Sequence, residues 1–118
     1  MGLLDAQGMV GLLKAAERNH NLIANNLANL NTPGYRTGRL RFSQALESVL
    51  DGRSDLLPGR NVETEIHRPM YADASPDGND VTLSREIVEL NKNTLRMQLY
   101  LAALDARIRK MRTAIDGR

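Results

Sequence analysis

A chain of 118 residues has room for one domain, and 42% hydrophobic residues place it among globular rather than disordered proteins. Three Tyr, one Phe and no Trp leave the core to aliphatic side chains and Met, a composition typical of helix-on-helix packing. The formal charge of +2 gives no argument for a nucleic-acid or membrane partner, and the absence of Cys excludes disulfides and thiol catalysis.

The first residues have no basic n-region, and Asp5, Gln7 and Lys14 interrupt any apolar run there. We therefore expect no cleavable secretory signal. Apolar residues then alternate three and four apart, with His20 filling the one gap, at Ala6, Met9, Leu13, Ala16, Ile23, Leu27 and Leu30. This spacing predicts an N-terminal helix over residues 1–32 that ends in a turn, because Pro33 disfavours helix before it and Gly34 tolerates positive φ.

Residues 33–80 read as a loop-rich connector between helices. Residues 42–50 favour a short helical turn, and Val62, Thr64 and Ile66 alternate with polar residues like a brief strand. Residues 51–61 and 68–80 hold most of the Gly, Pro, Asp and Asn, which indicates loop.

The last third predicts a long helix over residues 82–116, with Thr82 as its N-cap. Its stripe again alternates four and three, at Leu83, Ile87, Leu90, Thr94, Met97, Leu101, Leu104, Ile108, Met111 and Ile115. Basic residues cluster before its end, where we expect them to complement the helix dipole, at Arg107, Arg109, Lys110 and Arg112.

Together these patterns predict one all-α domain over residues 1–118, in which the terminal helices pair as an antiparallel, coiled-coil-like hairpin. The expected seam between the helices comprises Leu13, Ile23, Leu27, Ile87, Leu90, Met97, Leu101, Leu104 and Ile108. A second stripe lies on another face of the last helix, at Val88, Leu95, Leu99, Ala102 and Ala106. Because one partner helix cannot cover two faces, we expect other molecules to cover this stripe and the isolated monomer to be marginally stable.

No catalytic motif is present, and we expect no enzyme activity, metal, cofactor or small-molecule substrate. His20 fits a packed or interface residue, and His67 a solvated loop. Arg36, Arg39 and Arg41 lie among aromatics, as in single-strand nucleic-acid sites, but a basic turn that pairs with nearby carboxylates explains them better.

Six asparagines crowd into residues 19–31, although Asn is a poor helix former. Asn25 and Asn29 are four apart and share a face, so their amides can bond to other chains or to the loop after Pro33. The alternative is that these asparagines are surface residues and local turn formers.

Three segments carry a resemblance to a known family. Residues 25–36 read NNLANLNTPGYR, residues 77–83 read DGNDVTL and residues 89–98 read ELNKNTLRMQ. They resemble the flagellar rod, hook and hook-associated protein family, in particular its proximal rod type. Thr82 stands where the family usually has Asp, and Met97 where that type usually has Tyr. The resemblance covers residues 1–42 and 77–118.

The resemblance implies a structural subunit that is exported without a cleaved signal and polymerises through its terminal helices into a periplasmic rod that transmits torque. The implied partners are other copies, other rod subunits, and the membrane-ring and export-gate proteins of the basal body, with no nucleic acid. Taken together with the second stripe and the Asn face, we expect the assembly residues to be Asn25, Asn29, Thr32, Pro33, Gly34, Tyr35, Val88, Leu95, Leu99 and Ala102. The rival hypothesis is a small helical-hairpin adaptor or chaperone that binds one partner helix.

Overall fold

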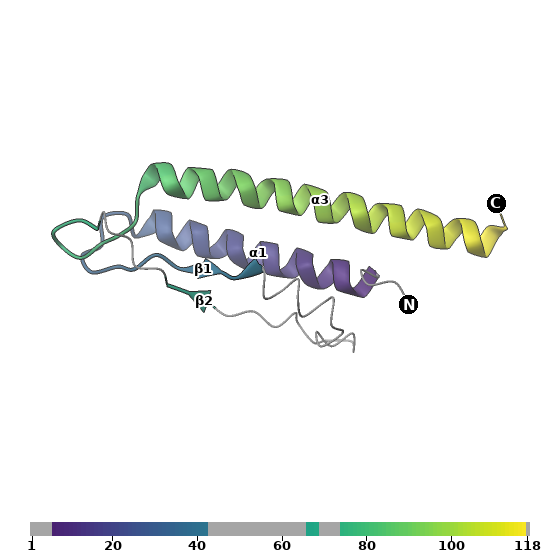
Figure 1. Ribbon diagram of the computed structural model, residues 1–118, viewed down its shortest axis with the longest axis horizontal. Helices are drawn as coiled ribbons and strands as arrows, with labels where there is room; N and C mark the ends of the chain where they lie inside the picture. Colours follow the sequence, from purple (N-terminus) through teal and green to yellow (C-terminus); the bar gives the residue numbers. More distant parts are fainter. Residues whose placement is uncertain (1–5, 43–65, 69–73, 118) are drawn as a thin grey trace.

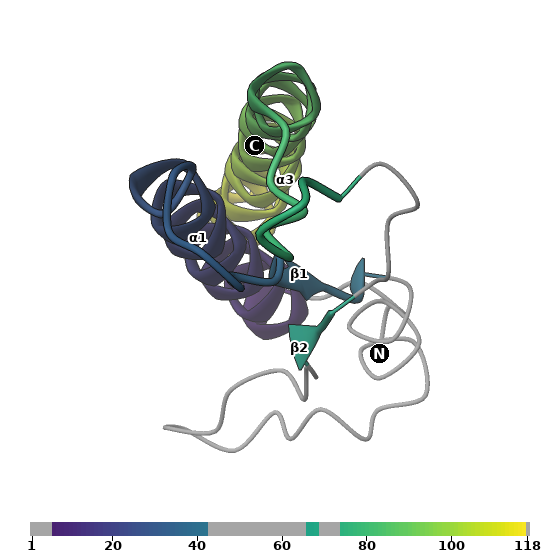
Figure 2. The same ribbon diagram turned by 90° about the vertical axis from the view of Figure 1, so that its left-hand side faces the viewer.

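The computed structural model describes residues 6–42, 66–68 and 74–117. Helix α1 spans Ala6–Ala28 and helix α3 spans Leu83–Asp116, and the two lie antiparallel along a molecule of 64 × 24 × 21 Å (Figure 1). The strands β1 (Arg39–Leu40) and β2 (Ile66–His67) form a two-stranded antiparallel sheet, in which β1 contacts α1 (Figure 2). The predicted all-α hairpin of terminal helices is confirmed.

Helix α1 ends in a run of tight turns. The amide of Asn29 donates to the carbonyls of Asn25 and Asn26, both at 3.1 Å, and the amide of Thr32 donates to the carbonyl of Asn29 at 3.1 Å. Gly34 then has a φ of +75°, a conformation that L side chains rarely adopt. Regular helix therefore stops at Ala28, and the Thr-Pro-Gly segment turns the chain back along α1.

Helix α3 has 34 residues, about 50 Å at roughly 1.5 Å per residue. Thr82 occupies its N-cap position with extended backbone, yet its side chain makes no capping hydrogen bond. Gly117 closes the other end in the left-handed conformation, with its amide donating to the carbonyl of Thr113. The last turn contains no basic residue, so the predicted basic cluster ends before the turn in which it would complement the helix dipole.

The predicted strand is present in part, because Ile66 pairs with Leu40 and His67 with Arg39. Val62 and Thr64 lie outside the described residues, as do residues 43–50 of the predicted helical turn and residues 51–61 of the predicted loop. His67 therefore belongs to a strand rather than to the loop that was expected.

The apolar core is small and lies between the N-terminal half of α1, β1 and the middle of α3. Its buried members are Met9, Leu12, Ala15 and Leu40, and the half-buried side chains packed on them are Leu22, Phe42, Tyr100, Ala103 and Leu104. The guanidinium of Arg96 lies 4.4 Å from the centre of the Phe42 ring, which covers one edge of this core. Burial raises the pKa of the Tyr100 phenol.

The contact face of each helix contains polar residues as well as apolar ones. The inward row of α1 is Met9, Leu12, Ala16, Asn19, Ile23 and Asn26, whereas His20 is exposed. The buried residues of α3 are Glu86 and Asn93.

The face of α3 that packs on α1 is therefore centred about one residue before the seam that the apolar spacing predicted. Among predicted seam residues, Ile23 is buried, Leu13, Leu27, Leu90, Met97 and Leu104 are half-buried, and Ile87, Leu101 and Ile108 are 45%, 53% and 45% exposed. The shift arises because polar side chains, which an apolar stripe leaves out, occupy the middle of the interface.

Candidate assembly site

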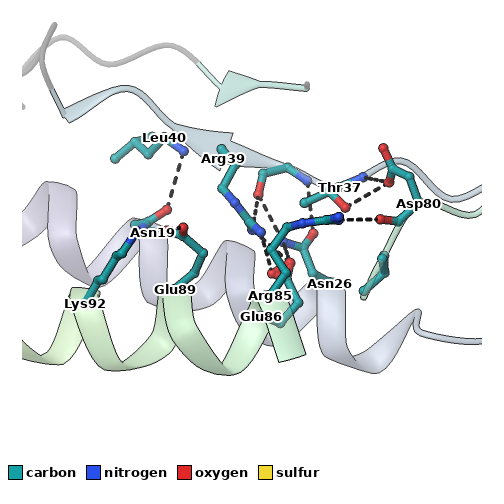
Figure 3. A network of polar contacts seen from close by, with 12 residues as sticks. Asn19, Asn26, Thr37, Arg39, Leu40, Asp80, Arg85, Glu86, Glu89 and Lys92 are labelled. Carbon is teal, nitrogen blue, oxygen red and sulfur yellow. Dashed lines mark hydrogen bonds and ion pairs between the residues drawn. The ribbon is translucent and has the colours of Figure 1, made fainter. Parts of the chain in front are cut away.

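A network of buried polar contacts holds the loop end of the hairpin together (Figure 3). Its first centre is Asn26 on α1, which is fully buried. The Asn26 side-chain amide donates to the Gly38 carbonyl at 3.0 Å and to Glu86 Oε1 at 2.8 Å, and its oxygen accepts from the Gly38 amide at 3.0 Å. One side chain thus connects α1 to the strand segment and to α3.

Glu86 on α3 forms the second centre, with a side chain only 1% exposed. The Arg39 guanidinium binds it through both nitrogens, with Nη1 at 2.8 Å from Oε1 and Nη2 at 2.7 Å from Oε2. This bidentate geometry is the strong form of an Arg–carboxylate pair. Together with Asn26, it compensates the cost of burying the carboxylate between the helices.

Asp80 anchors the loop that leads into α3. Its Oδ1 accepts from the amide of Thr37 at 2.6 Å and from the Thr37 hydroxyl at 2.8 Å, and Arg36 lies 3.3 Å from its Oδ2. Arg85 donates to the Asp80 carbonyl at 3.1 Å (Figure 3). The strand segment and the entry to α3 are therefore fixed to each other as well as to α1.

These contacts bear on the nucleic-acid hypothesis for the arginine segment. Arg39 is buried against Glu86, and Arg36 pairs with Asp80. Of the three arginines, Arg41 is the exposed one. The segment behaves as the alternative predicted, a basic turn that pairs with nearby carboxylates.

Asn79 covers the end of α1. Its side-chain amide lies within hydrogen-bond distance of the carbonyls of Asn29, Leu30 and Thr32, at 2.8, 3.2 and 2.6 Å, and its oxygen accepts from the Val81 amide at 2.7 Å. Carbonyls at a helix C-terminus lack partners within the helix. The loop before α3 therefore supplies a donor to the carbonyls of the turn that directly follows Ala28, the last residue of α1.

Asn19 and Asn93 form a second link between the helices, nearer the core. The Asn19 amide donates to Asn93 Oδ1 at 3.0 Å, and the Asn93 amide donates to the Ala16 carbonyl at 2.8 Å. Seven residues separate Asn19 from Asn26, and seven separate Glu86 from Asn93, so the two links repeat at heptad spacing. A shift of the helices by one residue would break both links, which fixes the register of the hairpin.

The predicted assembly residues near the turn lie at the loop end of the molecule. Asn25, Thr32, Pro33 and Gly34 are exposed. Asn29 bonds locally instead, since its amide donates to the Asn25 carbonyl at 2.8 Å and its oxygen accepts from the Thr32 hydroxyl at 3.0 Å.

Tyr35, the last of this group, is half-buried, and its hydroxyl lies 3.4 Å from Asn26 Oδ1. It supports the inner network, whereas the exposed members of the group form its outer surface.

The second stripe of α3 is uncovered along its length. Val88, Leu95 and Leu99 are 51%, 64% and 65% exposed, and Ala102 is exposed as well. Leu95 lies two residues from the buried Asn93, so at about 100° per residue it faces nearly away from α1. The structure brings none of these residues into the hairpin.

Sequence reasoning missed the buried polar residues Asn19, Asn26, Asp80, Glu86 and Asn93. A usable signal exists on α1, where the three-four alternation remains unbroken from Met9 to Asn26 once Asn is allowed at inward positions. No comparable signal identifies Glu86, because its partners come from α1 and β1. In the described residues, neither helix is long and apolar enough to span a membrane.

Comparison with known proteins agrees with this arrangement. The family model described as "Flagella basal body rod protein" matches residues 10–36, which contain the inward asparagines of α1 and the turn after it. Three relatives are each named "Flagellar basal body rod protein FlgB". The one from Cereibacter sphaeroides (strain ATCC 17029 / ATH 2.4.9) is 33% identical over 86% of this chain and 85% of its own length.

The relative from Bacillus subtilis (strain 168) is 25% identical over 94% of this chain and 92% of its own length. That from Salmonella typhimurium (strain LT2) is 27% identical over 81% of both chains. These matches extend over both helices and the connector. The chain belongs to the flagellar basal body rod protein family, as a structural subunit of the rod and not an enzyme.

Proposed function

We propose that this rod subunit assembles with copies of itself and with other rod subunits through the second stripe of α3, defined by Val88, Leu95, Leu99, Ala102 and Ala106. The observation that carries the proposal is the exposure of this stripe on a helix whose other side packs on α1. The row is unbroken from Leu95 to Ala106, and exposed apolar rows of this kind on a surface helix are normally covered by another molecule.

The size of the stripe indicates many weak contacts rather than one strong one. Burying the exposed two-thirds of Leu95 and Leu99 would contribute about 2–4 kcal/mol. Association costs roughly 4–15 kcal/mol in lost rigid-body freedom. A single pair of subunits is therefore weakly bound, whereas a subunit that touches several neighbours in a tube is held firmly.

The loop end supplies a second contact surface in this proposal. Asn25, Thr32, Pro33 and Gly34 are exposed, and the inner network holds them in one conformation. A rigid loop end suits end-to-end contact with other basal-body proteins, for which the membrane ring and the export gate are our candidates. In this proposal the rigid loop end helps the assembled rod to transmit torque.

Replacing Leu95 and Leu99 together with Asp tests the proposal. We expect a chain with the helicity of the dilute, unassembled wild type that no longer polymerises in sedimentation assays and no longer restores motility to cells that lack it. The matched control, Leu95→Met with Leu99→Met, keeps the stripe apolar and should assemble. Normal assembly of the Asp variant would refute the role of the stripe.

The adaptor hypothesis makes a different prediction in the same assay. It requires a stoichiometric complex with one partner helix and no open-ended polymer. Light scattering on the purified wild-type chain distinguishes the two, since growth of large particles with concentration excludes the adaptor.

A further inference from the structure

The C-terminal tip of α3, defined here as residues 105–116, extends beyond the described part of α1. The links Asn19 to Asn93 and Asn26 to Glu86 set the register, which places Ala6 level with Ala106. Figure 1 shows α3 running on beyond the N-terminal end of α1. In that part of the helix the row that contains Leu104 continues, at four- and three-residue spacing, as Ile108, Met111 and Ile115.

The exposure of this row rises toward the end of the helix. Ile108, Met111 and Ile115 are 45%, 53% and 81% exposed, whereas Leu104, the preceding residue of the row, packs on the core. The tip therefore repeats the face that binds α1 without a helix among the described residues to cover it.

A hollow of about 260 Å³ lies on the tip, lined by Ile108, Met111, Arg112 and Ile115. Counted along the helix, these residues are i, i+3, i+4 and i+7. Such a set of four forms the hole that receives one side chain of a facing helix in knobs-into-holes packing. The spacing of the lining residues thus matches a hole that would receive an apolar side chain of a second helix.

The tip also carries a cluster of positive charges that does not help to stabilise the hairpin. Four basic residues lie within six positions, Arg107, Arg109, Lys110 and Arg112, against Asp105 and Asp116. The ion pair between Arg109 and Asp105, 3.0 Å long, joins two side chains that are 71% and 66% exposed. Like charges three or four apart weaken a helix, and the dipole acts within the last turn, where no basic residue lies.

We infer that the tip binds an acidic amphipathic helix of a different protein, with an apolar side chain in the hollow and carboxylates facing Arg109, Lys110 and Arg112. Charge complementarity selects this occupant. Among the described residues, a second copy offers little unpaired acidic charge near its helix faces. Beside the second stripe, Glu89 pairs with Lys92 at 3.6 Å and Asp105 with Arg109 at 3.0 Å, and Glu17 is the one acidic residue within α1.

The shape of the tip also distinguishes a helix from a membrane surface. Helices that lie on bilayers present a broad apolar face. Here one row of three side chains is bordered by Arg112, which is the narrow seam of helix pairing. This contact is separate from the second stripe and does not depend on it.

The test uses the full chain and two synthetic helical peptides with the same Leu seam, one flanked by Glu and one by Lys. Fluorescence anisotropy should show binding of the Glu peptide at least tenfold tighter than that of the Lys peptide, and weaker in high salt. Met111→Asp should reduce this affinity about tenfold, and Lys110→Glu with Arg112→Glu should reverse the preference. Circular dichroism confirms that each variant keeps its helicity.

Three outcomes would overturn the inference: equal binding of both peptides, a preference that survives the charge reversal, or retention on anionic phosphatidylglycerol vesicles that Met111→Asp abolishes while the Glu peptide does not bind. Leu99→Asp separates this inference from the proposed function. That variant should lose assembly yet bind the Glu peptide normally, and loss of peptide binding would show that the peptide binds the second stripe rather than the tip.

Discussion

At the scale of single residues, the hairpin depends on side chains that are costly to bury. Glu86 and Arg39 are held between α1, β1 and α3 with side chains 1% and 11% exposed. Replacing such a pair with apolar groups is often neutral, whereas removing one partner leaves a buried charge without compensation. The pair therefore adds little net stability, but its buried charges are paired only when α1, β1 and α3 pack in the native arrangement.

Glu86→Gln tests this role because it keeps the size of the side chain and removes its charge. We expect a loss of about 3–5 kcal/mol in the free energy of unfolding, measured by urea denaturation, since Arg39 remains buried without its counter-charge. In a small chain this loss is comparable to the total stability, so reduced helicity at 222 nm is the alternative readout.

Glu89→Gln is the matched control, because Glu89 pairs with the exposed Lys92 and should change stability by less than about 1 kcal/mol. The double variant Arg39→Met with Glu86→Leu should recover most of the loss. Equal effects of Glu86→Gln and Glu89→Gln would show that the buried pair carries no special constraint.

At the scale of elements, two loops fix how α1 and α3 meet. The Gly34 amide donates to the Asp77 carbonyl at 2.9 Å, and the Asp80 amide donates to the Tyr35 carbonyl at 3.2 Å. The turn after α1 and the entry to α3 thus form one unit, which holds the exposed loop end in place.

Gly34→Ala tests the conformation of this unit. Gly34 has a φ of +75°, and an added Cβ would meet no atom within 4 Å, so the whole cost is backbone strain. We expect a loss of about 1–2 kcal/mol by thermal or urea unfolding. Gly34→Asn should cost less, because Asn tolerates the left-handed region, and equal costs would point to a lost contact instead of strain.

Much at this scale could be predicted from the sequence. The two helices, the turn at Pro33 and Gly34, and the start of α3 after Thr82 follow from periodicity and local chemistry. The face of α3 could not be placed, because Glu86 and Asn93 read as surface residues until Asn19, Asn26 and Arg39 provide partners from elsewhere in the chain. Apolar spacing identifies the inward-facing side of an amphipathic helix to within about one residue. The buried polar groups determine its exact position.

At the scale of the whole molecule, few large apolar side chains in residues 6–42, 66–68 and 74–117 are fully buried compared with those that stay exposed. The buried core has Met9, Leu12, Ala15 and Leu40 at its centre, whereas the exposed large apolar residues of α3 alone are Leu83, Ile87, Val88, Leu95, Leu99, Leu101, Ile108, Met111 and Ile115. Among the described residues, the exposed large apolar side chains of α3 outnumber the buried side chains at the centre of the core, so assembly can bury substantial further apolar surface.

We therefore expect helicity at 222 nm to rise with protein concentration, in step with the appearance of large assemblies in size-exclusion light scattering. Dilution should reverse both signals together. A monomer that is fully helical and unfolds cooperatively at every concentration would show that the hairpin is stable alone.

The long-range links between α1 and α3 also determine when the chain can fold. Asn93 bonds to the carbonyl of Ala16, 77 positions earlier, and Glu86 bonds to Asn26, 60 positions earlier. An isolated α1 contains asparagines that disfavour helix, and a helix of its length is barely stable in water. While the last third of the chain is not available to pack on it, we expect the first third to have no stable structure, and both helices to become ordered only when the two ends of the chain meet.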